Sequence, residues 1–75
     1  ERPLVEAFMN YSADILDLSS IDLAGRNIDN MFVGATIGTI YVKDEANKAA
    51  IEASITKTRN LGGIVEIDFE RILIK

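Results

Sequence analysis

The sequence predicts a small α+β domain of two layers, in which one helix packs on a short sheet. Three features predict it: an apolar, β-leaning run over 31–42, an alanine-rich helical pattern that starts after Asp44, and an alternating run over 64–70 that follows Gly62-Gly63. A helix between two strands is a βαβ-type unit, which is a right-handed crossover if the two strands are parallel neighbours. An intervening strand could equally separate them. With the first third included, the expected order is helix, short strand, strand, helix, strand.

The first element expected is a short helix over about 3–13. Pro3 suits the first position of a helix, and apolar side chains follow it at helical spacing at Leu4, Phe8, Tyr11 and Ile15. A helix this short depends on docking for its stability, so its Leu4/Phe8/Tyr11 face is expected to be either core or interface. A short strand near Ile15–Leu18 is expected to follow.

Apolar residues then recur at every fifth position, at Leu18, Leu23, Ile28 and Val33. Asp or Asn precedes the first three of them. This spacing resembles the pentapeptide-repeat family, whose units carry Asp or Asn before a central Leu or Phe. The resemblance covers about 17–33 and implies a single coil of a solenoid, which needs stacked neighbours for stability. The chain departs from the family two positions before each centre, where a small residue is usual and this chain has Leu16, Ile21, Arg26 and Met31. The alternative is a polar connection with turns at Ser19-Ser20 and Gly25-Arg26-Asn27.

The run from Met31 to Val42 is almost continuously apolar, which is typical of a central strand covered on both faces. Asp44 is expected to cap the following helix, and Gly62 to provide its left-handed exit. The buried stripe of that helix is expected to consist mostly of small side chains: Ala46, Ala49, Ala50 and Ala53, with Ile51 and Ile55.

In the final strand, the alternation of apolar and acidic residues predicts one face in the core and one face exposed to solvent. Val65, Ile67 and Phe69 are expected in the core, opposite a wet face that consists of Glu66, Asp68 and Glu70. The alternation of apolar and polar residues then breaks, because Ile72 and Ile74 fall on the face of the carboxylates. A bulge near Arg71, or burial of this end by a partner, would each explain the break.

Composition limits what can stabilise the domain. The chain has 75 residues, which indicates one domain over 1–75, and it starts with Glu1, which suggests a domain excised from, or part of, a larger chain or assembly. It has no cysteine and no histidine, so neither a disulfide nor the usual zinc site is expected. No metal or cofactor is expected. Oligomerisation is the remaining common aid for so small a core.

Charge and hydropathy exclude two kinds of partner. The formal net charge of −4 argues against a nucleic-acid surface, which needs clustered Lys and Arg. No apolar run approaches the length of a membrane span. The absence of cysteine fits a cytoplasmic location.

The sequence offers no catalytic constellation, so an enzyme is less expected than a binding module. Ser54 and Lys57 match the S-x-x-K pattern of β-lactamases, but Ser54 falls in mid-helix rather than at a helix start. A fragment of an enzyme subunit remains a third possibility.

The function expected first is a non-enzymatic protein–protein interaction or oligomeric assembly module, as a homo-oligomer or with a protein partner. Its interface is expected at five apolar residues: Ile72, Leu73, Ile74, Phe8 and Tyr11. The alternative is a small-ligand-binding regulatory domain of the ferredoxin-like type. Its ligand would bind at the sheet edge of a dimer, near Gly34, Thr36 and Gly38.

Overall fold

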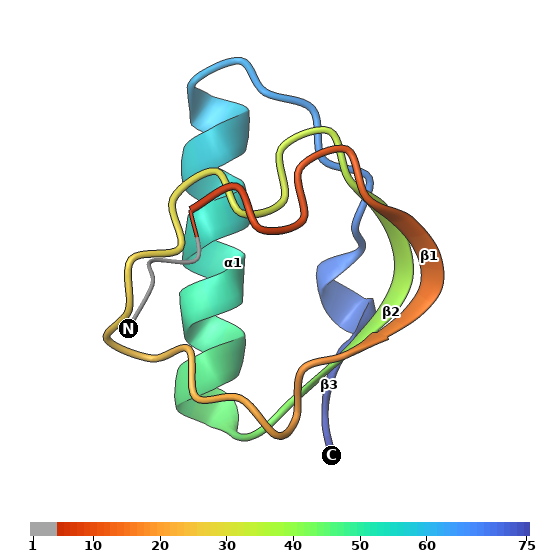
Figure 1. Ribbon diagram of the computed structural model, residues 1–75, viewed down its shortest axis with the longest axis vertical. Coiled ribbons are helices and arrows are strands. Elements are labelled where there is room, and N and C mark those ends of the chain that lie inside the picture. The colour runs from red at the N-terminus through yellow and green to blue at the C-terminus, as the bar shows by residue number, and fades with distance from the viewer. Residues whose placement is uncertain (1–4) are drawn as a thin grey trace.

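The computed structural model describes residues 5–75 and shows a small mixed α/β domain of two layers (Figure 1). Its elements are β1 (Ser12–Asp17), β2 (Thr36–Val42), α1 (Glu45–Asn60), a 3₁₀ turn (Phe69–Arg71) and β3 (Ile72–Ile74). The strands form one sheet in the order β1-β2-β3, and α1 covers one face of it.

Both strand pairs are parallel. One row of the sheet aligns Leu16 of β1 with Ile40 of β2 and Ile72 of β3. All three side chains are buried and belong to the core cluster beneath α1, together with Ile51 and Ile55 of the helix. β2, α1 and β3 thus form the expected βαβ unit, although the all-parallel sheet departs from the antiparallel pairing usual in α+β folds.

The ends of α1 follow the sequence signals. The Asp44 carboxylate accepts the backbone N–H of Asn47 at 3.0 Å. The hydrogen bond from the Asn47 side-chain amide, and then this cap, hold the pKa of Asp44 below its ordinary value. Gly62 lies just past the helix with a φ of +92°. Few side chains tolerate that left-handed conformation.

The expected alanine stripe of α1 is wrong. Ile51 and Ile55 are buried, but Ala46, Ala49 and Ala53 are exposed, and Ala50 is half-buried. The other buried positions are polar: Asn47, Ser54 and Thr58. Each is hydrogen-bonded within the fold, which is what makes its burial tolerable.

Two of these polar side chains, those of Asn47 and Ser54, attach the long β1–β2 connection to the helix. The side-chain oxygen of Asn47 accepts the backbone N–H of Leu23 at 2.5 Å, and Ser54 Oγ donates to the carbonyl of Ile28 at 2.7 Å. Leu18, Leu23 and Ile28 are buried, so the five-residue spacing marks the apolar anchors of a connection that runs along α1 (Figure 1). The connection consists of turns and bends, not a solenoid coil.

The helix expected over 3–13 is also wrong for the part that the structure describes; residues 3 and 4 lie outside it. Residues 5–10 form successive turns, and β1 begins at Ser12. Glu6 and Asn10 have φ values of +62° and +59°, which interrupt a right-handed helix. Phe8 packs from this turn onto the ring of Phe32, with 5.9 Å between the ring centroids.

The central strand is shorter than its apolar run. Asn30 and Gly34 are left-handed, with φ values of +56° and +75°, so the chain turns there and β2 begins only at Thr36. A side chain at Gly34 would also collide with the side chain of Asn10. Met31, Phe32 and Ala35 are nevertheless buried, so this apolar run marks core rather than strand.

The phase of burial shifts in the sheet and in the final segment. In β2 the buried residues Ile37 and Thr39 are followed directly by Ile40 and then Val42. Gly38 lies just before this shift, and a Cβ there would be 2.7 Å from the backbone oxygen of Asp14 in β1.

In the final segment, the phase of burial shifts at the 3₁₀ turn. Val65 and Ile67 are in the core as expected, and only Glu66 bridges to Thr36 before Phe69–Arg71 turns the chain. The turn returns Ile72 to the core, where it is fully buried. The expectation that Ile72 points away from the core is therefore wrong, and Phe69 is only half-buried.

Candidate interaction surfaces

The outer face of the sheet, opposite α1, carries apolar side chains from all three strands, of which Ile15 and Leu73 are exposed and Tyr41 is half-buried. The row next to that of Leu16, Ile40 and Ile72 aligns Asp17, Tyr41 and Leu73. Ile15 lies two positions before Asp17, on the same face of β1. Ile15 is 60% exposed. We call Ile15, Tyr41 and Leu73 the outer-face patch.

An ion pair closes one end of this patch. Lys75 Nζ lies 2.6 Å from Asp17 Oδ2 and 5.2 Å from the centroid of the Tyr41 ring. The hydrogen bond from Lys75, and then those from the Ser19 hydroxyl and N–H, lower the pKa of Asp17 well below its ordinary 3.8. The same contact raises the pKa of Lys75. The pair thus links β1 to the residue that follows β3.

We predict that this ion pair makes stability fall at acid pH. Because the pKa of Asp17 is lower in the folded state, its contribution is present above the unfolded-state value near 4 and is lost as the pH falls through the folded-state pKa. Lys75→Met should raise the pKa of Asp17, measured by NMR titration of its carboxyl carbon. Lys57→Met, which removes another exposed lysine, should leave it unchanged. Equal titration of Asp17 in all three proteins would contradict the assignment.

Polar contacts border the rest of the patch. The guanidinium of Arg71 donates to Thr39 Oγ1, with distances of 3.2 Å from Nε and 2.8 Å from Nη2. β1 pairs with β2 along one edge, and no other strand among residues 5–75 pairs with its second edge. An apolar patch beside an open strand edge is a surface to which another polypeptide can add.

The five interface residues expected from sequence lie in different places. Leu73 and Ile74 are exposed at the C-terminal end of the sheet, whereas Ile72 is in the core. Phe8 is half-buried against the core, and its ring meets that of the exposed Tyr11 edge-on at 5.3 Å. Sequence reasoning missed Ile15 as a surface residue, although its place in β1 beside the buried Leu16 is the signal that assigns it.

The residues of the alternative ligand site lie in or just before the central strand of the sheet. Thr36 and Gly38 belong to β2, and Gly34 precedes it. Thr36 is paired with Ser12 on one side and with Glu66 on the other. All three residues are exposed and lie at the surface of the domain.

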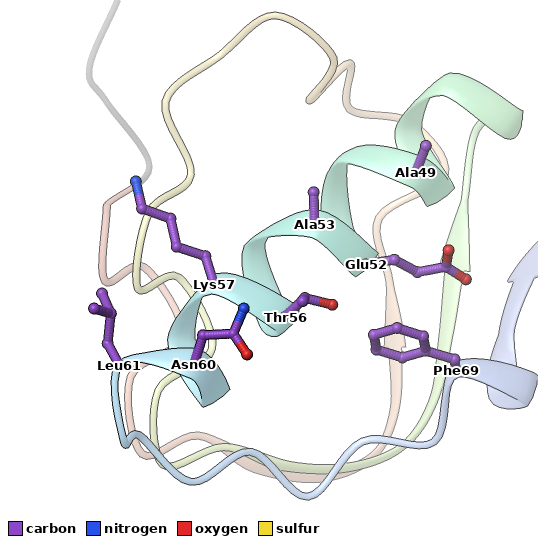
Figure 2. Close-up of a pocket in the computed structure, with 8 residues that line it drawn as sticks. All are labelled: Ala49, Glu52, Ala53, Thr56, Lys57, Asn60, Leu61 and Phe69. Atoms are coloured by element: carbon purple, nitrogen blue, oxygen red, sulfur yellow. The ribbon is translucent and has the colours of Figure 1, made fainter.

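The outward side of α1 is a second candidate surface. A hollow of about 550 Å³ runs beside Ala49 and Ala53 and is bordered by Phe69, Glu52 and Leu61 (Figure 2). A smaller hollow of about 260 Å³ lies on the other flank, between the helix and the turn at 26–29. Arg59 stabilises the border, because its guanidinium donates to the carbonyls of Val65 and Ile67 and lies over the ring of Phe69.

Both residues of the S-x-x-K match are engaged in contacts within the fold. Ser54 of the S-x-x-K match is buried and donates to a backbone carbonyl, and Lys57 pairs with Asp29 at 3.0 Å. Among residues 5–75, no group of three or more Asp or Glu side chains is placed to hold a metal ion. Within the same range, no buried side-chain nitrogen or oxygen lacks a hydrogen-bond partner.

Comparisons with known proteins add no relative: no family model, curated protein or solved structure matches the chain. No helix in residues 5–75 is long and apolar enough to cross a membrane.

Proposed function

We propose that this chain is a protein association module, and that the outer-face patch is the surface through which it self-associates. The observation that carries the proposal is an all-parallel sheet with α1 on one face and apolar side chains exposed on the other. Parallel sheets occur almost only with both faces covered. A second copy of the chain would supply the missing cover.

The patch has the composition of a small interface. Ile15 and Leu73 provide apolar area, and Tyr41 adds an aromatic ring that stays partly accessible beside Lys75. Each buried apolar square ångström contributes roughly 25 cal/mol, so a patch of three side chains supports a weak contact rather than an obligate one.

The border of the patch carries both signs of charge. Asp17 is acidic, whereas Lys75 and Arg71 are basic, and all three are exposed. A twofold contact places the same surface of both copies against itself, so a border of mixed charge can pair with itself. This favours a second copy over a partner of one strong charge.

The test is an Ile15→Glu substitution, with mass measured by light scattering over a range of protein concentrations. The mutant should show a smaller concentration-dependent increase in mass than the unmodified chain, because a carboxylate is poorly tolerated in a desolvated contact. It should keep its circular dichroism, since Ile15 is 60% exposed and Glu there remains hydrated. Ile21→Glu, at a partly exposed residue of the β1–β2 connection, is the matched control. Association that survives Ile15→Glu unchanged would refute the proposal for this face.

A further inference from the structure

The outward side of α1 supports an inference that goes beyond the proposed function, because it concerns a different surface. The buried side of α1 consists of Asn47, Ile51, Ser54, Ile55 and Thr58. On the opposite side the helix presents four exposed residues, at the spacing of a coiled-coil seam: Ala49, Ala53, Thr56 and Asn60.

The shape of this side suits close contact with another helix. Ala49 and Ala53 project only methyl groups from the crest of α1 (Figure 2). Hollows of about 550 Å³ and about 260 Å³ lie on its two flanks. A second helix can therefore approach the crest closely, with its longer side chains over the hollows.

The charges on the two flanks identify the occupant. Glu52 lies beside Phe69, and Lys57, which borders both hollows, projects to the other side of the crest (Figure 2). Two parallel helices related by a twofold axis along their length bring opposite flanks together, at the five-residue offset typical of ion pairs between parallel helices. Glu52 of each copy then meets Lys57 of the partner subunit. Antiparallel helices would bring like flanks together, with repulsion between like charges.

We propose that α1 pairs in parallel with α1 of a second copy through the seam of Ala49 and Ala53, and that two reciprocal Glu52–Lys57 ion pairs fix the orientation. Lys57 is available for this exchange, since its own partner is Asp29 in an ion pair whose side chains are 59% and 48% exposed. Exposed pairs of this kind contribute little to stability and are readily exchanged.

The first test uses disulfide cross-linking, because the chain has no cysteine of its own. Ala49→Cys and Ala53→Cys are made separately in the Ile15→Glu background, which removes the contact of the sheet face. In the parallel arrangement each position faces itself, so both variants should form covalent dimers under mild oxidation. Ser20→Cys, in an exposed loop, is the control and should form no covalent dimer. Cross-linking of neither seam variant above this control would overturn the proposal, and cross-linking of only one would overturn the parallel orientation.

The second test reverses charge in the same background, with association measured by sedimentation. Glu52→Lys should weaken the dimer at least about tenfold, because two like-charged contacts replace two ion pairs. Adding Lys57→Glu should restore association, since the reversed pair is again complementary. A single variant that associates normally, or a double variant that fails to recover while its circular dichroism is native, would refute the ion pairs. Because the background lacks the sheet-face contact, neither result bears on the proposed function.

Discussion

Ile72→Ala should destabilise the domain by about 2–5 kcal/mol, the range for removing a fully buried isoleucine side chain and leaving a cavity. Ile72 is 0% exposed and completes the buried row with Leu16 and Ile40. Because a domain of this size has only a few kcal/mol of net stability, much of the mutant should be unfolded. Urea unfolding followed by circular dichroism measures the change.

Ile74→Ala is the matched control, two positions later in the same strand. Ile74 is 46% exposed, so its truncation should cost much less than that of Ile72. Without the phase shift at the 3₁₀ turn, Ile72 and Ile74 would both face away from the core, and both truncations would cost little. Equal, small losses at the two positions would therefore show that the turn does not shift the phase as described.

Phe32→Ala should lower the free energy of unfolding by a comparable or larger amount, about 3–5 kcal/mol, because it removes the largest fully buried side chain. The Phe32 ring also stacks on Phe8, with an interplanar angle of 10°. Its removal should therefore loosen the turn at 5–10 as well as the core. Loss of protection from hydrogen exchange at the backbone N–H of Phe8, which donates to Met31, would report on that loosening.

Phe69→Ala is the informative comparison for Phe32. Alternation of the final segment predicts Phe69 as core, but it lies half-buried in the 3₁₀ turn, against Arg59. Its truncation should cost clearly less than that of Phe32. If Phe69→Ala proved the more destabilising change, the assignment of the core would be wrong.

The second half of the fold could be predicted from sequence because local signals there agree with one another. Asp44 caps α1, Gly62 ends it, and the apolar run before it contains β2. The mixed α/β class and the βαβ unit follow from these signals. The first third could not be predicted in the same way, since Phe8 and Tyr11 fit helical spacing while the left-handed Glu6 and Asn10 place the segment in turns. Glutamate gives no sequence signal for that conformation.

The buried side of α1 could not be found from hydrophobic periodicity. Alanine is nearly neutral between core and surface, so the pattern of Ala46, Ala49 and Ala53 fits either side of a helix. The side that is buried contains Asn47 and Ser54, whose partners are backbone groups of Leu23 and Ile28, far away in sequence. Such tertiary hydrogen bonds are not visible in a local pattern.

The candidate surface could be predicted only in part. The excess of apolar side chains near the C-terminal end indicated an exposed patch there, and Leu73 and Ile74 are exposed. Which neighbours complete the patch depends on strand order and register, which bring Ile15 and Tyr41 beside Leu73. Composition specifies neither the strand order nor the register.

Sedimentation equilibrium of the unmodified chain over a wide concentration range tests the central claim, that this domain associates with itself, most directly. The weight-average mass is expected to rise above the 8.2 kDa of one chain as concentration increases. A single species of 8.2 kDa at every concentration would contradict it.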